Sequence, residues 1–348
     1  MKLWVTIEKK LRDFTLHIHL EAGAKQGIVA LLGASGAGKS VALKCIAGLM
    51  QPDKGKIILG KRVLFNSERK INLPPRQRNV GYLFQSYALF PHLTLLENVC
   101  FGMKTKDKAR AREWLAKVAL QDWAQTYPKE LSGGQQQRAA LARMLAAEPE
   151  AILLDEPFAA LDGHLRWQLE RTVETCIQNF GGPAVIVTHD IGEAYRLSQN
   201  IVIVEKGQAE AQRPTAEFFQ HPRTLAAARL TGCQNFSQTK VSGEYLLASD
   251  WGISLHIPRL QLQHPEKIAY IGIRATDMQP VKGTNINTFT FPISQKIVDV
   301  HTYIFLLQTP KAGATLRWEI AKENFHEDER ETSVQLMLPV EKLLLLEQ

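Results

Sequence analysis

The chain has 348 residues, a formal net charge of +7 and a hydrophobic fraction of 45%. This length suits two domains, the first large enough for a sizeable core. Lys and Arg are spread along the chain without a basic block, so we expect no nucleic-acid partner.

The cysteines and the apolar stretches exclude other classes of protein. The four cysteines stand far apart with no C-x-x-C spacing, which argues against a zinc site and a disulfide framework and fits a reducing cytosol. The N-terminus is too charged for a signal peptide, and no stretch approaches about 18 apolar residues. We therefore expect any membrane role to come through partner subunits.

A glycine-rich stretch joins a predicted strand to a predicted helix. Residues 27–32 form an unbroken apolar run typical of a strand buried on both faces, and apolar residues recur at helical spacing from Val41 to Met50. The residues between fit G-x-x-x-x-G-K-[ST], a loop whose backbone amides surround nucleotide phosphates. Lys39 would reach the β- and γ-phosphates of ATP, and Ser40 would hold Mg²⁺. The predicted ATP-binding residues are Gly33, Ala34, Ser35, Gly36, Ala37, Gly38, Lys39 and Ser40.

The stretch LSGGQQQR at residues 131–138 precedes a predicted helix. Ser132 and Gln135 fit a capping box, which accounts for these two residues. It does not account for Gly133 and Gly134, because glycine in a first turn costs on the order of 1 kcal/mol of helix stability. We therefore expect a ligand, most simply a phosphate, to come close to this backbone.

Two further predicted strands end in polar residues. The run AILLDEP at residues 151–157 places Asp155 and Glu156 at a strand end, and AVIVT at residues 184–188 leads to His189. Asp155 would anchor a water bound to Mg²⁺, Glu156 could accept a proton from an attacking water, and His189 could contact the γ-phosphate. Each motif alone is more typical of a cap or a solvated turn. Their position behind a phosphate-binding loop favours the chemical interpretation.

These motifs together resemble one family. GASGAGKS, LSGGQQQR, ILLDEP, the turn ALD at residues 160–162 and His189, in this order, closely resemble the nucleotide-binding subunit of ABC transporters. The resemblance implies an α/β fold, the P-loop NTPase ABC cassette, with a helical subdomain at about residues 86–150. Gln85 matches the family glutamine that senses Mg²⁺ and water; without the family match it is an ordinary surface glutamine.

The resemblance also implies how the site is assembled. In the family, the signature of one subunit closes over ATP held by the phosphate-binding loop of the other. The matching residues of this chain are Ser132, Gly133, Gly134 and Gln135. One phosphate loop and one signature in this chain therefore imply a homodimer with two composite sites. The implied catalytic residues are Glu156, His189 and Gln85, and the implied metal-binding residues are Ser40, Gln85 and Asp155. The aromatic residue that usually stacks on adenine is missing from residues 10–13, and Phe14 is the nearest candidate.

Residues 62–100 resemble the importer branch, and residues 63–73 are similar to those of molybdate and sulfate importers. The resemblance implies an ATPase subunit on the cytoplasmic face of the membrane, bound to permease subunits and, through them, to an extracytoplasmic solute-binding protein. Molybdate is the expected cargo, with tungstate or sulfate next. The alternatives are an importer for another small solute and a non-transport ABC ATPase, though no long coiled coil interrupts the cassette.

Strands replace helices in the last third of the chain. Residues 253–257 alternate in polarity, and residues 270–275 resemble the small, oligonucleotide-binding-like β-barrel appended to importer ATPases. We expect a cassette at residues 1–231 and a C-terminal β-barrel regulatory or dimerisation domain at residues 232–348. Whether this domain only dimerises or also responds to an anion stays open, with Arg274 and Lys282 as available cations.

Overall fold

Strands with unbroken apolar sequences lie at the centre of the first of two units. β3 (Ile28–Leu32), β8 (Ala151–Asp155) and β9 (Ala184–Thr188) are buried along their whole length. Such burial is typical of parallel strands covered on both faces, as the sequence predicts.

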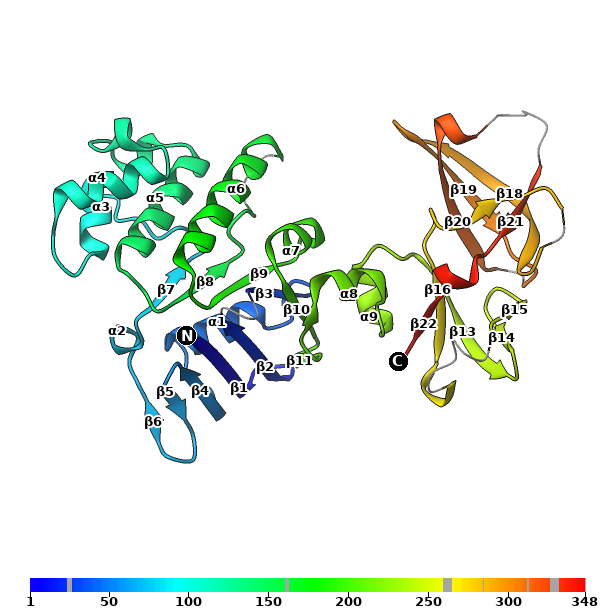
Figure 1. Ribbon diagram of the computed structural model, residues 1–348, viewed down its shortest axis with the longest axis horizontal. Helices are drawn as coiled ribbons and strands as arrows, with labels where there is room; N and C mark the ends of the chain where they lie inside the picture. The colour runs from blue at the N-terminus through cyan, green and yellow to red at the C-terminus, as the bar shows by residue number, and fades with distance from the viewer. Residues whose placement is uncertain are drawn as a thin grey trace. The chain divides into compact units, whose positions relative to one another are not determined.

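The chain divides into two units, Met1–Ala216 and Glu217–Gln348, and each is described by itself (Figure 1). The computed structural model describes residues 1–23, 27–159, 163–258, 265–283, 285–311, 313–325 and 332–347.

The first unit is built on a twelve-stranded mixed sheet. The strand order is β6-β5-β4-β1-β2-β11-β10-β3-β9-β8-β7, and β12 pairs with β10. The pairs β10 to β3, β3 to β9, β9 to β8 and β8 to β7 are parallel. The remaining strands are β1 (Lys2–Lys10), β2 (Thr15–Gly23), β4 (Lys54–Leu59), β5 (Arg62–Asn66), β6 (Ile71–Asn72), β7 (Val80–Leu83), β10 (Asn200–Glu205), β11 (Gln208–Ala209) and β12 (Arg213–Pro214).

Helix α1 (Lys39–Ala47) packs between two parts of this sheet. Leu43 and Ile46 of α1 belong to one hydrophobic cluster with Leu3 of the antiparallel strand β1 and Val185 of the parallel strand β9. The helix begins at Lys39, directly after the glycine-rich stretch. The predicted order of strand, glycine-rich turn and helix is confirmed.

A group of helices lies beside β7 and β8 (Figure 1). Their buried residues, among them Leu95, Val99, Leu115 and Ala139, form a hydrophobic cluster of their own. None of the described helices is both long and apolar enough to cross a membrane. The helices of the chain are α2 (Pro75–Arg78), α3 (Leu95–Gly102), α4 (Lys108–Lys117), α5 (Gly133–Ala146), α6 (Gly163–Phe180), α7 (Ile191–Leu197), α8 (Thr215–Gln220) and α9 (Leu225–Leu230), with α1 above.

The second unit contains two five-stranded sheets. Buried side chains of both sheets, including Leu255, Phe305 and Trp318, form one hydrophobic cluster, and the Trp318 indole N–H donates to Met278 O at 3.1 Å. The first sheet has β15 (Ile253–His256), β14 (Tyr245–Ala248), β13 (Asn235–Ser242), β16 (Tyr270–Ile273) and β22 (Leu344–Leu346); the second has β17 (Gln279–Pro280), β21 (Ser333–Met337), β18 (Thr288–Val298), β19 (Thr302–Gln308) and β20 (Thr315–Ala321). The predicted C-terminal β domain is confirmed.

Residues 217–231, which the sequence assigns to the end of the cassette, belong to the second unit. The backbone N–H of Leu225 in α9 donates to Glu347 O at 3.3 Å, and Glu347 N–H donates to Arg223 O at 2.7 Å. These bonds join α9 to the strand end beyond β22. Local sequence cannot reveal such a pairing, because its partners lie more than a hundred residues apart.

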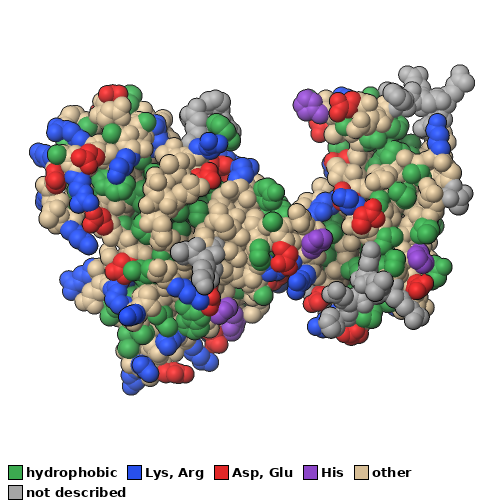
Figure 2. Space-filling view, viewed as in Figure 1, with side chains coloured by type: hydrophobic (Ala, Val, Ile, Leu, Met, Phe, Trp, Pro, Cys, Tyr) green, Lys and Arg blue, Asp and Glu red, His purple; other side chains and the backbone are tan. Residues whose placement is uncertain are grey.

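Charges of both signs are mixed on the surface of the first unit. Figure 2 shows Lys and Arg side chains interspersed with Asp and Glu on the face in view. On this face the positive charges are therefore not gathered into one patch.

The C-terminal end of α1 is held by a buried guanidinium. Arg78 is 0% exposed, and its NH1 donates to Cys45 O and Ile46 O, both at 2.8 Å. Its Nε donates to Leu73 O and its NH2 to Asn72 Oδ1, also at 2.8 Å. Burial lowers the pKa of Arg78. The side chain therefore satisfies the last carbonyls of a helix that water cannot reach.

Arg78→Met should lower the free energy of unfolding of the first unit by about 3 kcal/mol, because it leaves buried carbonyl groups without a donor. Urea unfolding followed by circular dichroism measures the change. The control is Arg110→Met, which removes an exposed ion pair with Glu148 and should cost at most about 1 kcal/mol. Equal losses from the two substitutions would contradict the capping role of Arg78.

Candidate functional site

Strand order brings the predicted site residues to one edge of the sheet. β3, β9, β8 and β7 are parallel neighbours in that order. The phosphate-binding stretch follows β3, His189 follows β9, Asp155 and Glu156 lie at the end of β8, and Gln85 follows β7. Because parallel strands end at the same edge, these groups converge there.

Two glycines of the stretch occupy positions that a side chain cannot. A Cβ at Gly33 would lie 2.2 Å from the carbonyl oxygen of Val204 in β10. Gly38, the N-cap of α1, has a φ of 100°, in the left-handed region. The chain thereby turns from β3 into α1 and presents the N–H groups of the helix start, which favour an anion.

Lys39 supplies a positive charge inside this turn. Its side chain is 4% exposed, and its Nζ donates to Gly33 O and Ala34 O, both at 2.8 Å. Burial lowers the pKa of Lys39, and the nearby charges of Glu156 and Asp155 oppose that shift. A buried ammonium beside the backbone amides at the start of α1 fits a polyanionic ligand such as the phosphates of ATP.

A cavity of ≈ 350 Å³ lies against the phosphate-binding stretch. It combines the predicted loop with Glu156 and with Phe14, the candidate for contact with adenine. Adenine stacking on Phe14 stays a prediction. The lining residues are Leu11, Arg12, Asp13, Phe14, Ser35, Gly36, Gly38, Lys39, Ser40, Val41 and Glu156.

Asp155 is held between two hydroxyl groups. Ser40 Oγ donates to Asp155 Oδ1 at 2.7 Å, and Tyr82 OH donates to Asp155 Oδ2 at 2.7 Å. Burial and this hydrogen bond raise the pKa of Tyr82, so the phenol stays a donor. A serine hydroxyl beside a carboxylate is a ligand pair that Mg²⁺ accepts, so the residues present fit the metal.

Glu156 is the point where the three predicted catalytic side chains meet. Its Oε2 accepts from Gln85 Nε2 at 3.3 Å, and its Oε1 lies 3.4 Å from His189 Nδ1. Glu156 has a φ of 44°, and its N–H donates to Val187 O in β9 at 3.0 Å. The left-handed backbone turns the chain sharply at the end of β8 and directs the carboxylate to this cluster.

The turn that carries His189 is fixed by its neighbours. Thr188 Oγ1 accepts from Asp190 N–H at 2.9 Å and donates to Glu193 Oε2 at 2.5 Å. Asp190 caps α7 by accepting from Glu193 N–H, and Arg166 NH1 donates to Asp190 Oδ2 at 3.0 Å. Burial raises the pKa of Glu193.

Sequence reasoning missed these supporting residues and Tyr82. In the sequence, Tyr82 is one alternating residue of a strand, and Arg166 is one charge on a helix surface. The sequence indicates a strand before Gln85, which contains Tyr82. Only the pairing of β7 with β8 places the Tyr82 phenol beside Asp155.

The signature residues lie apart from this cluster. Ser132 is the N-cap of α5, its Oγ accepts from Gln135 N–H at 3.3 Å, and Gln135 Oε1 accepts from Ser132 N–H at 2.9 Å. The predicted capping box is therefore present. Ser132 and Gly133 are exposed, and the cavity lining above contains no residue of the signature, Gly134 included. The predicted turn at residues 160–162 lies outside the described residues.

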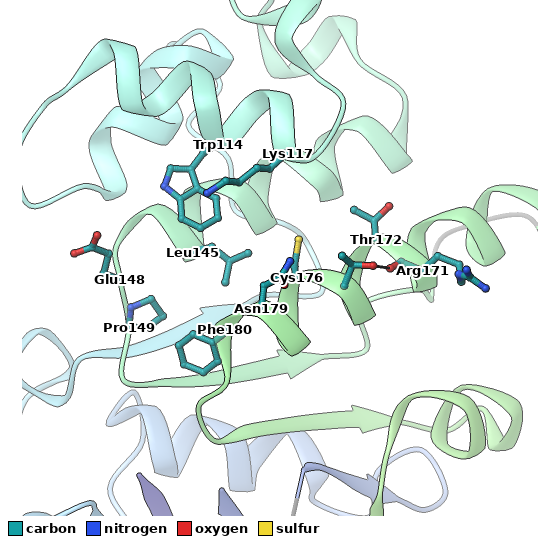
Figure 3. A pocket seen from close by; sticks show the side chains of 11 residues that line it. Trp114, Lys117, Leu145, Glu148, Pro149, Arg171, Thr172, Cys176, Asn179 and Phe180 are labelled. Carbon is teal, nitrogen blue, oxygen red and sulfur yellow. Dashed lines mark hydrogen bonds between the residues drawn. The ribbon is translucent and has the colours of Figure 1, made fainter. Parts of the chain in front are cut away.

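A larger cavity, of ≈ 800 Å³, lies elsewhere in the first unit (Figure 3). Trp114 and Lys117 of α4 line it together with Cys176 and Phe180 of α6, and Lys117 Nζ lies 4.0 Å from the Trp114 ring centroid. The described residues that line it include none of the predicted site residues. We therefore locate the candidate site by its chemistry, at the smaller cavity.

Comparison with known sequences gives matches along most of the chain. Residues 16–159 match the family model described as ABC transporter. The sulfate/thiosulfate import ATP-binding protein CysA of Synechocystis sp. is 40% identical over 223 residues, which are 62% of this chain and 61% of that protein, so less than two thirds of its length is spanned. The Fe(3+) ions import ATP-binding protein FbpC of Brucella abortus (strain 2308) is 35% identical over 288 residues, 80% of each chain.

A solved structure confirms the predicted fold of the first unit. A dimeric ATP-binding cassette in a post-hydrolysis state, bound to ADP and Pi, matches with a TM-score of 0.52 and 28% sequence identity. The match covers 62% of this chain and 99% of that one.

Lys39→Ala should raise the dissociation constant for ATP at least about tenfold, because it removes the charge that meets the phosphates. Calorimetry on the full chain measures this. Lys44→Ala, in the last turn of the same helix, is the control and should leave the affinity within about twofold. An unchanged affinity in the Lys39 variant would contradict the phosphate-binding role.

Proposed function

The chain belongs to the ABC transporter family of ATP-binding proteins, and on that premise we propose that it is the ATPase subunit of an oxyanion importer. The observation that carries the proposal is the cluster of Gln85, Glu156 and His189 beside the phosphate-binding stretch. The predicted family is confirmed. The activity and partners of the whole protein are our inference from this site.

The first part of the proposal concerns binding of ATP. The backbone amides at the start of α1 and the Lys39 ammonium hold the phosphates, and the cavity beside Phe14 receives the nucleoside. Mg²⁺ neutralises charge on the β- and γ-phosphates when bound. Ser40, Asp155 and Gln85 would hold it. Tyr82 keeps Asp155 Oδ2 oriented by its hydrogen bond of 2.7 Å.

The second part concerns the proton of the attacking water. Glu156 accepts this proton at its carboxylate, whose position is fixed by the turn after β8 and by Gln85 Nε2. His189 approaches the same carboxylate from the end of β9 and is placed to donate to the γ-phosphate. Gln85 and His189 thus lie within 3.4 Å of the carboxylate that accepts the proton.

The third part concerns a second copy of the chain. The signature is exposed at the start of α5 and does not line the cavity at the phosphate-binding stretch. We infer that the signature of one subunit, Ser132 to Gln135, closes over ATP held by the other, in a homodimer bound to permease subunits. An extracytoplasmic solute-binding protein would deliver the cargo, with this chain at the cytoplasmic face.

The cargo that we propose is a tetrahedral oxyanion. The relative from Synechocystis is named for sulfate and thiosulfate, and residues 63–73 resemble those of molybdate and sulfate importers. Sulfate is thus favoured by the names of relatives, and molybdate is the finer prediction from sequence. Fe(3+) is the alternative, because the iron-importer relative aligns over a greater share of the chain.

The second unit is proposed as a regulatory or dimerisation domain. Arg274 already has partners within this unit, because its NH2 donates to Phe219 O at 2.6 Å and its NH1 lies 3.9 Å from Asp277 Oδ2. An anion bound by Arg274 and Lys282 would compete with these contacts. Dimer contact is therefore the interpretation that we favour for this unit.

Glu156→Gln should slow hydrolysis at least about 100-fold while ATP binding stays within about twofold, because the amide keeps the shape of the carboxylate but accepts no proton. A closed, ATP-bound dimer should accumulate in size-exclusion chromatography with ATP and Mg²⁺. The control is Glu113→Gln on the exposed side of α4, which should hydrolyse ATP at the native rate.

Two outcomes would contradict the proposed roles of Glu156 and of the signature. A Glu156→Gln chain that stays monomeric and hydrolyses ATP normally refutes the catalytic role. Adding Ser132→Arg to Glu156→Gln should abolish the ATP-dependent dimer without loss of nucleotide binding, and a dimer that persists refutes the composite site.

Reconstitution in liposomes with the cognate permease and solute-binding protein tests the cargo. We expect sulfate or molybdate to raise the ATPase rate several-fold above the basal rate, because delivery of cargo promotes closure of the dimer. Fe(3+) serves as the comparison ligand at the same concentration. Stimulation by Fe(3+) alone would refute the oxyanion proposal and leave the ATPase role intact.

A further inference from the structure

The segment between Gln85 and α3 has no regular secondary structure, and two side chains hold it in place. Asn98 of α3 is 0% exposed and bonds the second half of the segment. Its Oδ1 accepts from Phe90 N–H at 2.9 Å, and its Nδ2 donates to Phe90 O and Leu93 O at 3.1 and 3.0 Å. These bonds replace those of a helix or sheet.

Arg143 of α5 holds the first half of the segment. Its NH1 donates to Ala88 O at 2.7 Å, and its NH2 donates to Tyr87 O at 3.0 Å. The guanidinium carbon lies 5.3 Å from the Phe90 ring centroid, a cation–π contact. Burial lowers the pKa of Arg143. A partly buried cation with these partners is costly to displace.

The two carbonyls that Arg143 binds belong to an unusual turn. Tyr87 has a φ of 60° and Ala88 a φ of 47°, and neither is glycine. A left-handed conformation costs about 1–2 kcal/mol for each such residue, so external bonds must maintain it. Tyr87 N–H also donates to Phe84 O at 2.9 Å, which closes the turn around Gln85. The bonds from Arg143 thus fix the backbone next to Gln85.

Arg143 stands on the helix that begins at the signature. Ser132 caps the first turn of α5, and Arg143 lies in its last turn. Gln85, held by the turn, contacts Glu156 through its amide. A single guanidinium therefore connects the signature helix to the loop that reaches the predicted catalytic glutamate.

We propose that Arg143 is a positioning residue that makes the Gln85 loop and the signature helix move as one unit. This inference rests on the proposed roles of Gln85 and of the signature. If Gln85 shifts when nucleotide or permease binds, the bonds to Tyr87 and Ala88 pass that shift to α5. Hydrolysis, which needs both parts aligned, then depends on Arg143, although this residue touches no nucleotide-binding residue.

The same helix offers a matched control. Arg138 NH1 donates to Val118 O at 3.0 Å and to Ala119 O at 3.4 Å, and Ala119 has a φ of 55°. Burial lowers the pKa of Arg138 as well. This arginine supports a left-handed turn at the end of α4 and does not bond the Gln85 loop. Arg138 therefore supports a turn as Arg143 does, but it does not link α5 to the Gln85 loop.

The experiment is a double-mutant cycle on the full chain. Arg143→Met and Arg138→Met are each made in the native and in the Gln85→Ala background, and kcat and the dissociation constant for ATP are measured. We expect Arg143→Met to lower kcat about tenfold and to leave the dissociation constant within about twofold. In the Gln85→Ala background, Arg143→Met should lower kcat by at most a further factor of about two. The reason is that the loop no longer reaches Glu156 through the Gln85 amide. Arg138→Met should cost the same factor in both backgrounds.

Two additional measurements separate positioning from simple loss of folding. Arg143→Lys keeps the positive charge and a single donor nitrogen, so it should restore part of kcat. Hydrogen exchange should rise in residues 85–93 for Arg143→Met and in residues 117–120 for Arg138→Met, with the rest of α5 unchanged. A general rise across the chain for Arg143→Met, or no rescue by lysine, would overturn the proposal.

Further results distinguish this inference from the proposed function. An effect of Arg143→Met that is equally large in both backgrounds, or a Gln85→Ala chain with native kcat, overturns the positioning role while Glu156→Gln still stops hydrolysis. If Glu156→Gln itself hydrolyses ATP normally, the proposed function fails, and the positioning role fails with it.

Discussion

Burial of helix α1 is the constraint on which the rest of the first unit depends. Because α1 packs against both the antiparallel and the parallel strands, its C-terminal end cannot rely on water for hydrogen bonds. The C-terminal end is satisfied by Arg78 and by the N–H of Gly48, which donates to Cys45 O. The N-terminal end has Gly38 as its cap and no side-chain cap bond. The helix thereby keeps its unpaired donors at the one end where a phosphate can bind.

Three of the left-handed residues other than glycine lie near Gln85. Tyr87 and Ala88 follow it in the chain, and Glu156 contacts its amide. Each is maintained by bonds from another element: Arg143 for the first two, and Val187 for Glu156. Such strain persists only where the surroundings fix the backbone, and it often marks sites where side-chain position matters for function.

Much of this site could be predicted from sequence because its parts are local. The loop with Lys39 follows from the order of strand, glycines and helix, and the capping box of Ser132 from a spacing of three residues. Buried strands such as β9 were recognisable from composition alone. The meeting of Gln85, Glu156 and His189 was expected through the family resemblance, since sequence spacing gives no strand order.

The remaining features depend on contacts between distant elements. The role of Tyr82 requires that β7 pair with β8, and the role of Arg143 requires that α5 pack against the loop after Gln85. Arginine on a helix is usually a surface charge, so no local pattern separates Arg143 from its neighbours. The pairing of α9 with the chain end beyond β22 is hidden for the same reason.

The capping box at the start of α5 also determines what kind of atom Ser132 can recognise. Its Oγ accepts from the N–H of Gln135, which leaves the hydroxyl hydrogen and a second lone pair free for another partner. Aspartate or asparagine would cap the helix equally well, but neither offers a hydroxyl donor. Capping alone would admit any of these residues, whereas an acceptor-only partner such as a phosphate oxygen needs a donor, which serine, threonine and asparagine retain and aspartate lacks. Ser132 can therefore donate to an oxygen acceptor from outside while its Oγ still holds the start of the helix.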